Sequence, residues 1–192
     1  MKVYVKYEAY RMMMLASKYA SPYEIAGLLY GTIDGRITVE EADVFRIQSV
    51  TASSVEISPK EFAEHVARLD REHVKKVIGF WHSHGSMSAF HSAIDVETSR
   101  LLVKQINPLI TLTTNRDGEI KAIIYVMIPR LSETLKIDAE VEIDMGDDNE
   151  LKNIIDRMKK RVESRQKKRN NMPWPAYDYI YYGYGYSWSD GD

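Results

Sequence analysis

The sequence predicts an α/β (α+β) fold in which a mixed β-sheet is flanked by helices. Short apolar segments of strand length alternate with longer segments whose apolar residues recur at helical spacing. The turn signals Asp34-Gly35 and Asp117-Gly118 lie between apolar segments and indicate hairpins. With 192 residues, the chain is long enough for one core of ordinary size and an appendage.

The expected elements follow one another along the chain. Strands are predicted where short apolar or alternating segments lie between turn signals, at residues 3–5, 24–31, 36–50, 77–84, 109–113, 120–128 and 134–143. Helices are predicted at residues 8–19, from residue 59 up to residue 77, and at residues 92–106 and 151–162. The methionines of the first helix are expected to fill the core. In the second helix, His73 falls on the apolar stripe and His65 falls off it, so we expect His73 to be buried and His65 to be exposed.

Composition excludes several classes of function. The chain has no Cys, which removes disulfides, thiolate catalysis and Cys-type zinc sites together. A formal net charge of -2 gives the whole molecule no electrostatic bias toward nucleic acid or membranes. No apolar run approaches the roughly 20 residues that span a bilayer, and the chain opens as a strand rather than as a signal peptide. We therefore expect a cytoplasmic protein without a membrane partner.

One stretch carries the chemistry of a metal site. Gly79-Phe80-Trp81-His82-Ser83-His84 is followed, after seven residues, by Ser92-Ala93-Ile94-Asp95. In a strand, His82 and His84 point to the same face and Ser83 points to the other, where we assign it no chemical role. Zinc accepts His nitrogen and Asp oxygen, and a catalytic zinc keeps a fourth position open for water. Both histidines and the later Asp95 therefore form a candidate three-ligand zinc site.

Two residues near this stretch have a second interpretation. Ser92 and Asp95 also fit a helix-capping box, because an apolar-periodic run follows them. Glu24 stands at the mouth of an apolar strand, where it is either a solvent-facing first residue or a catalytic carboxylate. The residues alone leave both questions open.

The combined pattern resembles the JAMM (MPN+) metalloprotease family over roughly residues 1–130. The matching residues are Glu24-x-x-Gly27-x-Leu29-x-Gly31 and, downstream, Gly79-x-x-His82-Ser83-His84, a gap of seven residues and Ser92-x-x-Asp95. One departure concerns the position after the second His, where the family often has Pro and this chain has Gly85. We expect the loop of residues 85–91 to be more mobile for that reason.

The resemblance implies a fold, a cofactor and a set of roles. The fold would be the curved, cytidine-deaminase-like sheet of the JAMM/MPN core. One catalytic Zn²⁺ would be held by His82, His84 and Asp95, with Glu24 as general base and Ser92 as a donor to the developing oxyanion. The substrate would be a ubiquitin-like protein or its conjugate, cleaved after its C-terminal tail. Two alternatives remain: hydrolysis of a small adduct on a sulfur-carrier protein, and a non-catalytic MPN-type scaffold for protein assembly.

One segment of the sequence is a candidate site for the C-terminal tail of the substrate. Residues 51–57 are small, polar and free of breakers, so we expect an extended tail to add a strand there.

The chain divides into a metalloprotease domain (1–146), an amphipathic, basic helix (147–170) and a Tyr/Gly-rich tail (171–192). The apolar stripe of residues 151–162 favours a homodimer or a larger assembly. Basic residues followed by aromatics are also typical of single-stranded nucleic-acid binding, but we expect a flexible tail and no nucleic-acid partner.

Overall fold

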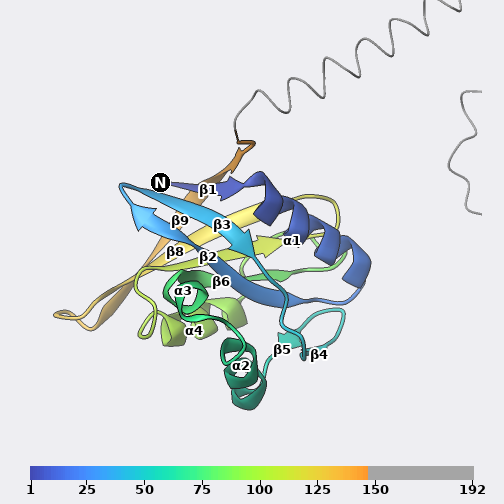
Figure 1. The fold of residues 1–192 in the computed structure, drawn as a ribbon, viewed down its shortest axis with the longest axis horizontal. Coiled ribbons are helices and arrows are strands. Elements are labelled where there is room, and N and C mark those ends of the chain that lie inside the picture. Colours follow the sequence, from blue (N-terminus) through green and yellow to red (C-terminus); the bar gives the residue numbers. More distant parts are fainter. Residues whose placement is uncertain (147–192) are drawn as a thin grey trace, which may run out of the picture. The chain divides into compact units, whose positions relative to one another are not determined.

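The computed structural model describes residues 1–146, and the helix and tail predicted for residues 147–192 lie outside the described residues. A mixed sheet closes into a barrel in the order β1-β3-β2-β6-β7-β8-β9 (Figure 1). Its strands are β1 (Lys2–Lys6), β2 (Ala26–Asp34), β3 (Arg36–Ala42), β6 (Val77–Ser83), β7 (Leu109–Thr114), β8 (Ile120–Ile128) and β9 (Glu133–Asp144). The helices are α1 (Tyr7–Ala20), α2 (Pro59–Val66), α3 (Arg71–Lys75) and α4 (Ala93–Leu102). A separate hairpin pairs β4 (Ser49–Val50) with β5 (Val55–Glu56).

The pairing of β1 with β9 closes the barrel. β1 runs parallel to both β3 and β9, and β6 runs parallel to β7. The β2–β3, β2–β6, β7–β8 and β8–β9 pairs are antiparallel. The predicted mixed α/β fold is confirmed. The sheet was expected to be curved, and it closes into a barrel. Within residues 1–146, none of the helices has the length and hydrophobicity that crossing a bilayer requires.

Alternating side chains divide the apolar residues between the inside and the outside of the barrel. Leu29 and Trp81 belong to the main core, to which α1 contributes Ala9 and Met13. The neighbouring strand residues belong to two smaller clusters, one containing Leu28, Tyr30 and Phe45, and the other containing Leu109, Ile123 and Tyr125. α1 lies on one side of the barrel, whereas α2, α3 and α4 gather on another (Figure 1). The two smaller clusters therefore pack the helices around the site described below.

The prediction of one helix from residue 59 to residue 77 is wrong. Asp70 interrupts it by accepting a hydrogen bond from the His73 backbone N–H at 2.8 Å, which caps α3 as a separate helix. The two histidines are also exchanged relative to the prediction. The His65 side chain is only 13% exposed and lies 2.7 Å from Asp43, whereas the His73 side chain is 43% exposed. The break between the helices changes which face each residue presents.

The prediction of a strand over residues 36–50 is also wrong in its second half. β3 ends at Ala42, and β4 begins only at Ser49. The Asp43 carboxylate accepts a hydrogen bond from the Leu28 backbone N–H at 2.7 Å. Two backbone bonds to β2 also persist past Ala42: the Asp43 N–H donates to the Leu28 carbonyl at 3.1 Å and the Phe45 N–H donates to the Ala26 carbonyl at 2.9 Å.

Replacement of Met13 by Ala tests the orientation of α1. The Met13 side chain is fully buried in the main core, so Met13→Ala should lower the free energy of unfolding by about 2–5 kcal/mol. Leu15→Ala, on the same helix at a position that is 44% exposed, should cost less than about 1 kcal/mol. Urea unfolding followed by circular dichroism measures both, and equal losses would contradict this orientation.

Candidate metal centre

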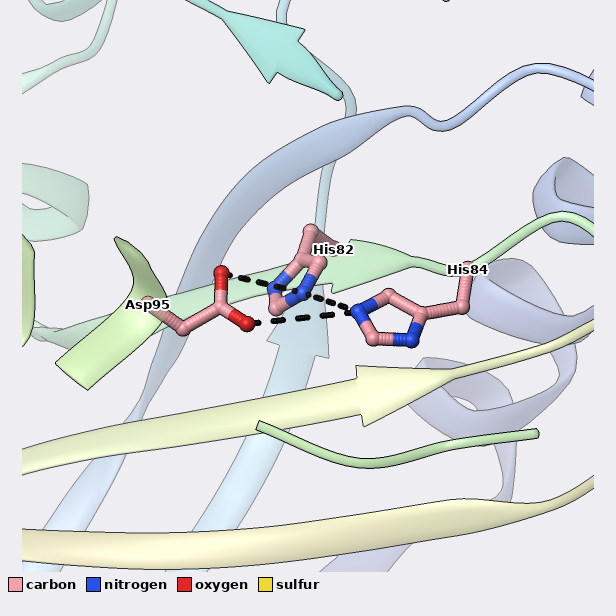
Figure 2. Close-up of side chains that lie close together, drawn as sticks. All are labelled: His82, His84 and Asp95. Carbon is pink, nitrogen blue, oxygen red and sulfur yellow. Dashed lines mark hydrogen bonds and ion pairs between the residues drawn. The ribbon is translucent and has the colours of Figure 1, made fainter. Parts of the chain in front are cut away.

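The end of β6 brings together the three predicted metal ligands. His82 and His84 are buried and point to the same side, with their Nε2 atoms 3.1 Å apart. Asp95, in the first turn of α4, points at both rings (Figure 2). Its Oδ1 is 3.3 Å from His82 Nε2 and its Oδ2 is 3.9 Å from His84 Nε2. One ligand atom from each residue lies within 4.8 Å of the others, so these side chains could hold a single metal ion.

Asp95 both caps the start of α4 and contacts the two histidines. Ser92 Oγ accepts a hydrogen bond from the Asp95 backbone N–H at 3.2 Å, and Asp95 Oδ2 accepts one from the Ser92 N–H at 2.6 Å. This reciprocal pair is the capping box that the sequence predicted. Burial acts to raise the pKa of Asp95, but the bonds from His82 and Ser92 outweigh it and hold that pKa well below its usual range. Asp95 is therefore an anion that the start of α4 orients toward the histidines.

Hydrogen bonding fixes the tautomer of His84. Its Nδ1 lies 3.1 Å from the Ser88 carbonyl oxygen, which can only accept, so Nδ1 carries the hydrogen. The lone pair of Nε2 then faces His82 and Asp95, as a metal ligand requires. Burial, together with the nearby His82, lowers the pKa of His84 and favours this neutral form. Among the described residues, His82 Nδ1 has no hydrogen-bond partner.

Glu24 lies on the same face as the two histidines. Ala26 pairs with His82 in the antiparallel β2–β6 ladder, and Ile25 exchanges hydrogen bonds with Ser83 one position further along. Glu24 is therefore level with His84, and directly opposed residues project from the same face. Its side chain is buried. Burial raises the pKa of Glu24, His82 acts to lower it and the Asp95 charge raises it further, so all three groups share one electrostatic environment.

Ser83 has a structural role that the sequence did not reveal. Its Oγ accepts a hydrogen bond from the Ile25 N–H at 3.1 Å, and its own N–H donates to the Ile25 carbonyl at 2.8 Å. Ser83 thereby holds the residue next to Glu24 on the strand that carries the two candidate metal ligands. The Glu24 N–H donates to the Thr51 carbonyl at 2.8 Å, which connects this segment to the β4–β5 hairpin.

Gly85 explains the departure from the family pattern after the second histidine. Its φ of +52° is incompatible with proline, whose ring fixes φ near -65°. A Cβ atom at this position would lie 2.3 Å from the Pro22 carbonyl oxygen. The absence of a side chain thus lets the segment before Glu24 approach the histidine motif.

The loop of residues 85–91, which was expected to be more mobile, is tied to the β7–β8 turn. The Arg116 N–H donates to the Gly85 carbonyl at 3.0 Å, and Asn115 Nδ2 donates to the Met87 carbonyl at 3.0 Å. The Ala89 N–H donates to Glu119 Oε2 at 2.8 Å. These bonds give the loop a defined path, and whether it moves more than its counterparts in relatives stays a prediction.

His91 is a half-buried residue of this region that the sequence motifs did not single out. Its Nε2 is 2.9 Å from Thr111 Oγ1, and its ring lies edge-on to His82 with centroids 6.3 Å apart. Thr111 Oγ1 donates to the Ile123 carbonyl, so His91 Nε2 donates to Thr111. Burial, with a smaller effect of His82, lowers the pKa of His91 to about 4. Its place directly before Ser92 was the only signal in the sequence.

An apolar cavity of about 650 Å³ reaches the ligand cluster at His82 and Asp95. Its walls come from β2, the β5 segment, α2 and α4, and include Ala26, Phe45, Ile57, Phe62, Ile94 and Leu102. This volume suits an extended peptide segment better than a single water molecule or ion. The candidate metal centre therefore adjoins a cavity large enough for an organic ligand.

Comparison with known proteins defines the family. The family described as prokaryotic homologs of the JAB domain matches residues 7–134. The chain belongs to this family. Its matched range contains Glu24, Ser92 and the three ligand residues, so the predicted JAMM/MPN membership is confirmed.

Individual relatives of this JAB-domain chain are distant. The 26S proteasome regulatory subunit rpn11 of Schizosaccharomyces pombe is 28% identical over 109 residues, which are 55% of this chain and 35% of that protein. Ubiquitin carboxyl-terminal hydrolase RPN11 of Saccharomyces cerevisiae is 25% identical over 135 residues, or 69% of this chain and 44% of that protein. The match thus spans less than half of either relative. A solution structure of a protein from Desulfitobacterium hafniense shares the fold, with a TM-score of 0.54 and 19% identity over 76% of this chain and 94% of that one.

The pH dependence of stability tests the burial of His91. Because its pKa falls from 6.5 to about 4 on folding, the unfolded chain binds more protons between these pH values. His91 should therefore cost about 3 kcal/mol of stability as the pH falls from 6.5 to 4. Chemical unfolding of the chelator-treated protein across this range, compared with His91→Leu, measures the difference, and an unchanged slope in the variant would contradict it.

Proposed function

We propose that this JAB-domain chain is a zinc-dependent metallo-isopeptidase or peptidase that cleaves after the C-terminal tail of ubiquitin or a ubiquitin-like modifier. The observation that carries the proposal is the convergence of His82, His84, Asp95 and buried Glu24 beside a peptide-sized cavity. A relative named as a ubiquitin carboxyl-terminal hydrolase supports the substrate class. The cytoplasm is the proposed compartment.

The donor set fits zinc. Two neutral imidazole nitrogens and one carboxylate oxygen are a common protein ligand set for catalytic zinc, which keeps one position open. The Nδ1 hydrogen bond of His84 and the capping bonds of Asp95 orient two of the ligands before any ion binds. When bound, zinc supplies a Lewis acid that makes water a usable nucleophile near neutral pH.

Glu24 is the proposed general base. Its raised pKa makes the ionised carboxylate a better proton acceptor than an exposed glutamate, whose pKa is near 4.5. Glu24 would take the proton of the attacking water and later give it to the leaving amine. Its backbone position is fixed on two sides, by Thr51 and through the Ile25–Ser83 pair, so the carboxylate needs little rearrangement to act.

Ser92 is the proposed oxyanion donor. Its Oγ accepts from the Asp95 backbone N–H, and no hydrogen bond donated by this hydroxyl is seen within residues 1–146. The hydroxyl can therefore cap α4 and still donate to a developing negative charge. Both interpretations of Ser92 that the sequence left open can hold in one geometry.

The β5 segment is the proposed site for the modifier tail. Within the predicted region 51–57, residues 51–54 form a tight turn and Val55–Glu56 form β5. Val55, Glu56 and Ile57 line the cavity that reaches the ligand cluster. An extended tail could pair with this short edge and direct its last peptide bond toward His82 and Asp95.

Replacement of Glu24 by Gln separates metal binding from catalysis. Glu24→Gln should lower kcat by about 100-fold or more, because a general base contributes on that scale, while zinc stoichiometry stays unchanged. Glu56→Gln, which alters another carboxylate of the cavity, should retain kcat. The measurements are cleavage of a panel of ubiquitin, ubiquitin-like and sulfur-carrier conjugates, and metal analysis by mass spectrometry.

The outcomes of this panel separate the alternatives. If the chain cleaves small adducts on sulfur carriers in preference to modifier conjugates, the proposed substrate is wrong and the proposed zinc chemistry stands. Failure of the parent chain to cleave any conjugate, with zinc bound, would favour the non-catalytic scaffold. Full activity of Glu24→Gln would contradict the proposed base.

A proline in β5 tests the proposed tail site. Val55→Pro removes a backbone donor from the short strand, so KM for the cleaved conjugate should rise about tenfold while zinc content and kcat hold. Ala52→Pro is the control, because the first central position of the turn tolerates proline. If steady-state kinetics give the same KM for Val55→Pro and the parent, the tail does not bind along β5.

A further inference from the structure

α2 forms one wall of the apolar cavity but has little burial to hold it there. Pro59 and Phe62 line the cavity, and none of the eight residues of α2 is fully buried. A Ser58–Glu61 capping box stabilises the start of the helix. The capping box stabilises the helix itself, but it does not hold the helix against the barrel.

His65 attaches α2 to the segment that follows β3. Its Nε2 lies 2.7 Å from Asp43 Oδ2, and because a carboxylate only accepts, Nε2 is the donor. The His65 ring also packs edge-on against Phe45, with centroids 4.8 Å apart. Phe45 in turn lies 5.9 Å from the Phe62 ring, and both phenylalanines line the cavity. One histidine thus fixes the helix through a hydrogen bond and an aromatic contact.

Asp43 joins three elements. Its Oδ1 accepts from the Leu28 N–H of β2 at 2.7 Å, and its Oδ2 accepts from the Tyr30 hydroxyl as well as from His65. Burial and the bond to Asp43 raise the pKa of Tyr30, which keeps that hydroxyl protonated and able to donate. The Asp43 carbonyl accepts from Trp81 Nε1 at 2.7 Å. Trp81 precedes His82 in β6, so Asp43 connects α2 with the strand of the metal ligands.

The close approach of Asp43 to β2 depends on Gly27. A Cβ atom at Gly27 would lie 1.8 Å from the Asp43 carbonyl oxygen and 2.7 Å from Trp81 Nε1. No side chain fits in that space without displacing backbone. The sequence pattern Glu24-x-x-Gly27 therefore carries a packing requirement of the Asp43 connection in addition to its carboxylate.

From these contacts we propose that Asp43 and His65 are positioning residues for substrate binding. They hold α2 so that Pro59 and Phe62 remain the wall of the cavity into which the substrate tail binds. The proposal rests on the proposed function for its substrate, but the placement of α2 can be tested without one. Neither residue contacts the reacting bond, so their loss should weaken substrate binding and leave the chemical step intact.

The test combines backbone exchange with kinetics on the full chain. His65→Leu keeps the bulk against Phe45 and removes the hydrogen bond, so amide hydrogen exchange over residues 62–67 should accelerate about tenfold. Exchange in β6 and zinc stoichiometry should hold. For the conjugate that the parent cleaves, KM should rise about tenfold with kcat retained. His65→Gln, which can still donate to Asp43, should restore most of both properties.

Controls and a second variant make the outcome decisive. Lys75→Leu changes an exposed residue of the neighbouring α3 that pairs with Glu72, and it should leave α2 exchange and KM unchanged. Asp43→Asn should reproduce the exchange and KM effects of His65→Leu if the latter does not fold. Unchanged α2 exchange in both variants, or a fall in kcat with constant KM, would overturn the inference. If the parent cleaves no conjugate, the proposed function fails, and the exchange measurement still decides whether Asp43 and His65 hold α2.

Discussion

The register between β2 and β6 is the constraint on which the rest of the site depends. Ala26 pairs with His82, and Ile25 and Ser83 exchange hydrogen bonds. Because side chains alternate along each strand, this register alone places Glu24 on the face of the two histidines. A slip of one residue would send Glu24 to the opposite face. Pro22 against Gly85 and the bond from Glu24 to Thr51 reinforce the same alignment from either side.

Burial then gives the aligned groups their chemistry. His82, His84 and Glu24 each expose 5% or less of their surface. In such surroundings the pKa of Glu24 rises and that of His84 falls, whereas hydrogen bonds keep Asp95 ionised. Two imidazole rings beside one anion are a donor set that suits a dication. The start of α4 and the loop before it supply the bonds that orient these ligands.

Much of this arrangement could be predicted because its signals are local. The His82–His84 alternation and the capping pair Ser92 and Asp95 depend only on strand and helix periodicity. The long-range features could not be predicted in this way. Pairing of β1 with β9, the bond from His65 to Asp43 and the contact of His91 with Thr111 join segments that no short pattern relates.

For Glu24 and Ser83, local sequence signals and long-range contacts had to be combined. Local sequence left Glu24 undecided, and the family pattern suggested its role without a physical reason. The β2–β6 ladder gives a physical reason for the position of Glu24 beside the histidines, and the Ser83 hydroxyl helps to hold that ladder in register. The histidine exchange in residues 59–77 arose because Asp70 caps a second helix and ends the apparent stripe.

A crystal structure of the zinc-loaded chain, with anomalous differences measured at the zinc edge, tests the central claim most directly. We expect one peak bound by His82 Nε2, His84 Nε2 and Asp95, with the Glu24 carboxylate facing the remaining coordination position. A peak held by other residues, or a Glu24 side chain directed away from the ion, would contradict it.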